Sequence, residues 1–152
     1  MKQERGFTLL ELLIVLALLS VIVGMAGLSL GRDGKRLAAQ EAGLFVQLVQ
    51  HVRQQAVLQG RPAGVRVDRG GYQLMQQTAS GWTAVGTAHA TGLSLRLELD
   101  DVPVSLQAHS ARPQVIANSN DEYTAFTLHF EQAGVRLATV MSDGLNDPWL
   151  DR

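Results

Sequence analysis

The chain has 152 residues, of which 46% are hydrophobic and 18% charged; its formal net charge is −1 and it has no cysteine. This length accommodates one ordinary domain, and the hydrophobic share excludes an intrinsically disordered chain. A net charge near zero argues against a protein that coats nucleic acid, and the lack of cysteine excludes disulfides, thiolate zinc sites and cysteine nucleophiles.

Charge is distributed unevenly along the chain. The net charge is 0 over residues 1–31, +4 over residues 32–69 and −5 over residues 70–152. An apolar first segment, a basic second segment and an acidic remainder indicate oriented assembly or contact with a charged surface.

The first segment predicts a transmembrane helix over residues 7–31, in which Glu11 is the sole charge. The 20 residues after Glu11 would span roughly 30 Å as a helix, the thickness of a bilayer's hydrocarbon core. Lys2 and Arg5 favour a cytoplasmic N-terminus, although bases also follow the span. A buried core helix is an alternative, but a domain this small cannot surround it. A removable secretory signal is another, but the apolar run is too long for one.

A short motif begins this span. Residues 6–11 read Gly-Phe-Thr-Leu-Leu-Glu, which resembles the processing site of the type IV pilin and pseudopilin family. The resemblance implies that a prepilin peptidase cuts between Gly6 and Phe7 on the cytoplasmic side and then methylates the new N-terminus at Phe7. It therefore implies a leader peptide over residues 1–6. Gly6 suits a cleavage site because a residue without a side chain lets the backbone approach the peptidase closely.

Glu11 is unusual because a carboxylate within an apolar span costs about 2.5–3.5 kcal/mol at mid-membrane, and less near the surface. One interpretation is that Glu11 reaches back to the lipid headgroups. The resemblance implies another, in which Glu11 pairs with the α-amino group of Phe7 that cleavage creates. Pairing of this kind between neighbouring subunits recruits each subunit and sets its register in a pilin-like fibre.

Small residues follow in the second half of the span. Gly27 and Gly31 form a GxxxG pattern, and Gly24 lies one turn earlier. These glycines either permit close helix packing or reflect the ordinary glycine content of membrane helices.

Beyond the span, apolar residues at helical spacing predict a helix over residues 36–59 that ends at Gly60 and Pro62. A kink or an interruption would fall at residues 31–34. One row of the predicted stripe contains Leu37, Glu41, Leu44 and Leu48, and the adjacent row contains Ala38, Ala42, Phe45, Val49, Val52 and Ala56. The predicted polar side contains Gln40, Gln47, Gln50, Arg53 and Gln54. We expect the stripe to pack on a β-sheet.

The remainder predicts about seven or eight short strands in an antiparallel two-sheet body. The clearest runs lie at residues 65–67, 72–74, 81–85, 93–99, 103–106, 126–130 and 135–137. Residues 107–124 and 142–152 are predicted loops. The fold class is therefore α+β, with a long N-terminal helix packed on a C-terminal β-sandwich. The expected domains after the leader are the transmembrane helix, a periplasmic extension of the helix over residues 32–60, and a β-rich periplasmic domain over residues 61–152.

A narrower resemblance begins at the predicted end of the helix. Residues 53–62 read Arg-Gln-Gln-Ala-Val-Leu-Gln-Gly-Arg-Pro, and a Val-x-Val strand and a Gly-Tyr hairpin follow. This segment resembles the GspH/FimT family, which includes the H-type minor pseudopilin of type II secretion and certain minor type IV pilins. The glutamate at position 11 separates the chain from the K-type tip pseudopilin. No acidic loop matches the calcium site of the major pseudopilin, and residues 100–101 and 146–147 fit solvated turns better than cation sites.

The favoured function is that of a minor pseudopilin, a structural tip subunit of the type II secretion pseudopilus that drives export of folded proteins across the outer membrane. It would be anchored in the bacterial inner membrane by a single pass, with its body in the periplasm. Its expected partners are other minor and major pseudopilins, the prepilin peptidase, the inner membrane and the secreted exoproteins. We expect no cofactor, no metal site and no nucleic acid.

Two further functions remain open. A minor type IV pilin, active in pilus assembly or DNA uptake, would need a basic patch on its body, and the net charge of −5 over residues 70–152 disfavours it. A membrane-anchored enzyme would need a catalytic motif. The chain has no P-loop, HExxH or nucleophile elbow, and its four histidines follow no metal-binding pattern. We therefore predict no catalytic residue.

Overall fold

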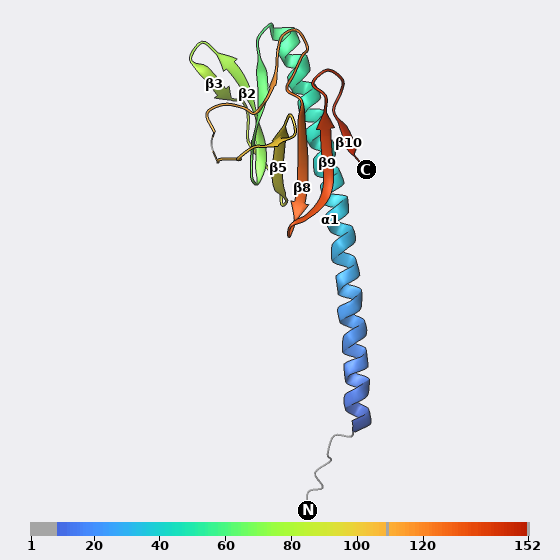
Figure 1. Cartoon of the computed structure of the whole chain (residues 1–152). Coiled ribbons are helices and arrows are strands. Elements are labelled where there is room, and N and C mark those ends of the chain that lie inside the picture. The colour runs from blue at the N-terminus through green and yellow to red at the C-terminus, as the bar shows by residue number, and fades with distance from the viewer. Residues whose placement is uncertain (1–8, 109, 152) are drawn as a thin grey trace, which may run out of the picture. The chain divides into compact units, whose positions relative to one another are not determined.

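The computed structural model describes residues 9–108 and 110–151, without the side-chain surroundings of residues 22–32. The chain divides into two compact units, Met1–Gly34 and Lys35–Arg152, and the second carries all the strands. Figure 1 labels the main elements.

Helix α1 spans Leu9–Gln59, so the predicted helix over residues 36–59 is confirmed. No interruption occurs at residues 31–34. After the helix, Gly60 takes a φ of +63°, the left-handed conformation that glycine adopts without a steric cost. The amide of Arg61 donates to the carbonyl of Ala56 at 3.2 Å, and that of Gly60 to Val57 at 3.3 Å. These bonds satisfy carbonyls at the helix end, as expected of a C-terminal glycine cap.

The strands form two antiparallel sheets. The first has the order β3-β2-β1-β7, and β4 also pairs with β2. Its members are β1 (Ala63–Asp68), β2 (Gly71–Thr78), β3 (Gly81–Ala84), β4 (His89–Ala90) and β7 (Val115–Ala117). The second has the order β10-β9-β8-β5-β6. Its members are β5 (Ser94–Leu99), β6 (Val102–Pro103), β8 (Phe126–Gln132), β9 (Val135–Ser142) and β10 (Trp149–Asp151).

The predicted hairpins are confirmed as β1–β2 and β8–β9. The two predicted loops were wrong in part, because residues 107–124 contain β7 and residues 142–152 contain β10. Strand β4 was also missed, and the predicted strand at residues 103–106 was wrong over residues 104–106, because β6 overlaps it only at Pro103. The three missed strands have only two or three residues each. Such strands are too short to show alternation, and pairing with a longer neighbour determines them.

The core of the second unit is built where α1 meets both sheets. One helix face is completely buried through Ala38, Ala42, Phe45, Val49, Val52 and Ala56. The ring of Phe45 packs edge-on against Tyr72 of β2 at 5.1 Å between centroids, and against Phe126 and Phe130 of β8 at 5.7 and 6.5 Å. The predicted α+β architecture, a helix packed on a two-sheet body, is therefore confirmed.

The predicted apolar stripe is wider than the buried face. Leu44 of the first row is 47% exposed and Leu37 is exposed as well. Glu41, in the same row, is buried. The row therefore lies at the margin of the helix–sheet contact rather than inside it.

Candidate assembly surfaces

The N-terminal part of α1 exposes its apolar side chains on all sides. From Leu9 to Val21, the large hydrophobic residues are 43–82% exposed. Glu11 lies in the first turn of the helix and is exposed as well. An apolar helix that is not covered by its own chain must be covered by other molecules, so this segment is a candidate surface for assembly.

The remaining predicted residues of the N-terminal segment cannot be placed in the same detail. Gly6 and Phe7 lie outside the described residues, as does the whole leader. Gly24, Gly27 and Gly31 lie within α1, but their surroundings are outside the described part. Among the helices of the described residues, none is both long and apolar enough to cross a membrane.

Arg53 anchors two distant loops to the helix. Its Nε and Nη2 donate to the two carboxylate oxygens of Asp121 at 3.2 and 3.1 Å, and Nη1 donates to Asp147 at 2.8 Å. Nη2 also donates to the carbonyl of Leu145 at 3.1 Å, and the guanidinium lies 4.5 Å from the ring centroid of Tyr123. We call these contacts the Arg53 clamp. The side chain of Arg53 is 10% exposed, so its placement on the polar side of the helix was wrong.

Further hydrogen bonds order the two loops that carry Asp121 and Asp147. The hydroxyl of Tyr123 donates to the carbonyl of Asn146, which joins the two loops directly. Burial raises the pKa of Tyr123, so its hydroxyl remains a donor at physiological pH. Asp143 accepts from the side chain of Asn146 at 2.7 Å and from the amides of Asn146 and Leu145 at 2.8 and 3.0 Å. These bonds lower the pKa of Asp143 to about 2 and order the turn that leads into β10.

A second polar cluster joins α1 to the first sheet. The Nε2 of His89 lies 2.9 Å from the Oε2 of Glu41, and its ring stacks on Tyr72 with 4.8 Å between centroids. Burial and the charge of Glu41 together raise the pKa of Tyr72 to about 12. At Gly71, a Cβ atom would lie 2.2 Å from the carbonyl oxygen of His89, so glycine is required for β4 to approach β2 here. The buried carboxylate of Glu41 therefore has the imidazole of His89 as its partner.

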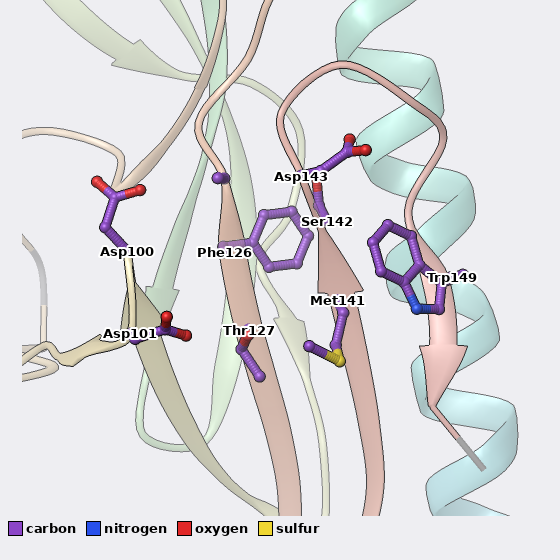
Figure 2. A pocket seen from close by; sticks show the side chains of 9 residues that line it. Asp100, Asp101, Phe126, Thr127, Met141, Ser142, Asp143 and Trp149 are labelled. Atoms are coloured by element: carbon purple, nitrogen blue, oxygen red, sulfur yellow. The ribbon is translucent and has the colours of Figure 1, made fainter.

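The outer face of the second sheet is mostly polar. It carries His129, which is buried with its Nδ1 3.0 Å from the hydroxyl of Thr139. Burial lowers the pKa of His129, with the positive charge of Arg136 acting in the same direction. Beside this cluster, a pocket lies at one end of the sheet between the β5–β6 turn and β10 (Figure 2).

The aspartates of the two acidic turns have structural roles. Asp147 belongs to the Arg53 clamp. Asp100 and Asp101 form the tight β5–β6 turn with φ of +48° and +62°, a conformation that aspartate tolerates better than most residues. Across the described residues, no group of three or more histidines or acids could hold a metal ion.

Sequence reasoning missed the Arg53 clamp and the partner of Glu41. The sequence pattern could have indicated a partner for Glu41, because a carboxylate within an apolar row requires one when the row is buried. No local pattern could have indicated the partners of Arg53, because they lie 68 and 94 residues further along the chain.

Comparison with known proteins agrees with these features. Residues 1–27 match the prokaryotic N-terminal methylation motif, and residues 41–144 match the family described as type II transport protein GspH. Type II secretion system protein H of Pseudomonas aeruginosa is 30% identical over an alignment of 165 residues, gaps included. The alignment covers 97% of this chain and 96% of that protein. The Escherichia coli (strain K12) protein of the same name is 28% identical over 143 residues, 88% of this chain and 85% of that protein.

A solved structure shows the same fold. The crystal structure of the minor pseudopilin EpsH from the type II secretion system of Vibrio cholerae superimposes with a TM-score of 0.65 and 26% identity. The match covers 76% of this chain and 94% of that one.

A long helix packed on two antiparallel sheets, with an N-terminal methylation motif that overlaps the start of the helix, defines a pilin-like protein. More particularly, the chain belongs to the GspH family of type II transport proteins. The prediction of an H-type minor pseudopilin of type II secretion, a structural subunit rather than an enzyme, is confirmed by these relatives. The alternative of a minor type IV pilin is not favoured by them.

Proposed function

We propose that this minor pseudopilin is built into the tip region of the type II secretion pseudopilus, a periplasmic fibre that drives folded proteins across the outer membrane. The observation that carries the proposal is the stretch from Leu9 to Val21, where exposed apolar side chains surround a single carboxylate, Glu11. Such a helix needs lipid before assembly and neighbouring helices after it.

The proposed organisation follows from the sequence boundaries. Residues 1–6 form a leader that the prepilin peptidase removes, and residues 7–31 anchor the mature chain in the inner membrane. Residues 32–60 extend the helix into the periplasm, and residues 61–152 form the periplasmic body. The methylation motif at residues 1–27 supports this arrangement. The partners are other minor and major pseudopilins, and the exported proteins meet the completed fibre.

Glu11 acts in assembly through charge pairing. Cleavage after Gly6 creates an α-amino group on Phe7, and N-methylation preserves its positive charge. In an apolar environment the attraction between this ammonium and the Glu11 carboxylate of a neighbouring subunit is much stronger than in water. The pairing recruits the subunit and sets its axial position, while Gly24, Gly27 and Gly31 allow close helix packing.

The processing step is tested by mass spectrometry of the protein from its native host. We expect a chain that lacks residues 1–6 and begins at a methylated Phe7. The same protein from a strain without the prepilin peptidase is the control and should retain the leader. An intact leader in the wild-type strain, or a start near residue 32, would contradict the proposal.

The pairing step is tested with Glu11→Leu. We expect normal membrane insertion but at least a ten-fold loss of secretion, because the apolar variant cannot attract the ammonium group. Glu11→Asp, which keeps the charge, should retain part of the activity. Glu131→Gln removes a carboxylate from the second sheet and serves as the control. Normal secretion by Glu11→Leu would rule out the proposed pairing.

A further inference from the structure

The pocket of the second sheet combines an apolar floor with an acidic rim. Thr127 of β8 is paired with Met141 of β9, which is paired in turn with Trp149 of β10, so all three side chains lie in one row on the same face. Trp149 is 44% exposed. Figure 2 shows Asp100 and Asp101 on one side of the pocket and Trp149 on the other, with Thr127 and Met141 between them. The cavity has a volume of about 270 Å³.

The rim carries charge that the body does not neutralise. Asp100 and Asp101 are both exposed, and neither forms an ion pair with any residue of the described part of the chain. Asp143 also lines the pocket, with its carboxylate held by the turn into β10. An exposed tryptophan beside uncompensated carboxylates is an unusual surface, because exposed aromatic rings are favoured where a partner covers them.

We propose that this cavity receives a basic side chain, an arginine or a lysine, from a neighbouring subunit of the pseudopilus. The cationic head lies at Asp100 and Asp101, and the aliphatic stem lies across Thr127 and Met141 toward Trp149. The identity of the neighbour rests on the proposed function, whereas the chemistry of the cavity does not.

A basic side chain fits the cavity better than a metal ion does. A hard divalent cation needs six or more converging oxygen ligands, and no three acids or histidines converge here among the described residues. A long basic side chain needs only one or two carboxylates for its head, together with an apolar surface for its methylene groups. The cavity supplies both.

The Arg53 clamp makes the cavity rigid before a partner arrives. The clamp holds Leu145 and Asp147, which lie between Asp143 and Trp149 along the chain. Binding therefore requires little additional ordering of the loop, and preorganisation of this kind increases affinity. Arg53 is in this respect a positioning residue for the cavity.

The proposal is tested by NMR on the full chain in detergent micelles, using the indole N–H signals of Trp82 and Trp149. The probe is the peptide acetyl-Gly-Arg-Gly-amide, and its neutral counterpart contains citrulline in place of arginine. We expect the arginine peptide to shift the Trp149 signal saturably and to leave Trp82 unchanged. The citrulline peptide should bind at least five-fold more weakly, and binding should weaken as salt is added.

The acidic rim is tested with the double variant Asp100→Asn, Asp101→Asn. Asparagine tolerates the positive φ values of this turn, so the fold is retained, as unchanged Trp82 signals would verify. We expect at least a five-fold loss of affinity for the arginine peptide, whereas the control Glu131→Gln should bind normally. Equal binding by the double variant, no shift of Trp149, or a stronger response to calcium alone would overturn the proposal.

The outcome is separable from that of the proposed function. If the peptide fails to bind while Glu11→Leu abolishes secretion, the cavity proposal is wrong and the pseudopilus function stands. If the peptide binds while Glu11→Leu secretes normally, the cavity is a cation-binding site and the assembly mechanism is wrong.

Discussion

The two ends of helix α1 show how one secondary structure serves two environments. From Leu9 to Val21 the apolar side chains are exposed on every side, whereas from Ala38 to Ala56 a single apolar face is completely buried by the chain's own sheets. Among the described residues, the first segment has no intramolecular cover for its apolar surface, whereas the second has one face covered and leaves only marginal apolar residues such as Leu44 exposed. The comparison teaches that helical periodicity distinguishes a segment that the chain covers itself from one that other molecules must cover.

The charged residues of the two segments follow the same division. Arg53 is buried in the second segment and has two carboxylates of its own chain as partners. Glu11 lies in the first segment, where the proposed partner is an amine of another subunit. The ion pairs of Arg53 therefore stabilise the body of one chain, whereas the pairing proposed for Glu11 would act between subunits.

The largest expected effect tests the burial contrast directly. Phe45→Ala removes the ring that contacts both sheets and should lower the free energy of unfolding by about 3–5 kcal/mol. The matched change Leu13→Ala, in the exposed segment, should change it by less than about 0.5 kcal/mol. Urea unfolding of the full chain in mild detergent, followed by tryptophan fluorescence, measures both. Similar losses in the two variants would break the comparison.

An intermediate effect is expected for Arg53→Met, which keeps the side-chain volume but removes the clamp. We expect a loss of about 1–3 kcal/mol, since charge-assisted hydrogen bonds disappear while Asp121 and Asp147 remain hydrated. The same denaturation experiment applies, with Arg61→Met at the exposed helix end as the control. A wild-type unfolding midpoint for Arg53→Met would show that the clamp does not stabilise the body.

The smallest expected effect concerns pH and belongs to the outer face of the second sheet. Because the pKa of His129 is lowered in the folded protein, the unfolded chain takes up a proton at higher pH than the folded chain does. At a pH above about 6.5, protonation of His129 therefore takes nothing from the free energy of unfolding. As the pH falls below that value, the unfolded chain binds the proton first, and the free energy of unfolding decreases. Thermal unfolding should show a larger decrease between pH 7.5 and 5.5 for the wild type than for His129→Gln.

The control for this pH effect is His51→Gln, which changes an exposed histidine of α1. It should retain the wild-type pH dependence. An unchanged pH dependence in His129→Gln would assign the effect to other groups.

Much of the fold was predictable because it depends on local patterns. The end of α1 follows from Gly60, and β5 follows from strict alternation over residues 94–99. Strands β7 and β10 were not predictable, because three residues contain too little pattern and the neighbouring strands β1 and β9 define them. Local sequence therefore predicts elements that are stable by their own periodicity, but not those completed by distant partners.

The same reasoning applies to the candidate sites. Glu11 was identified because its charge interrupts a long apolar run, a contrast visible within a few residues. The pocket beside Trp149 was not identified, because it needs the β5–β6 turn and the C-terminal strand to lie at one end of the same sheet. Its residues come from four separate stretches of the sequence, and only the sheet order brings them together.

The Arg53 clamp also has a consequence for how the body is made. Arg53 is synthesised early, but Asp121 and Asp147 follow 68 and 94 residues later. Contacts over such separations form late in folding, because long loops must close first. The carboxyl end of the helix thus lacks its contacts with the two loops until nearly the entire polypeptide has been synthesised. A prematurely terminated chain would lack the Arg53 clamp, so its helix end would be more accessible to proteases than that of a finished subunit.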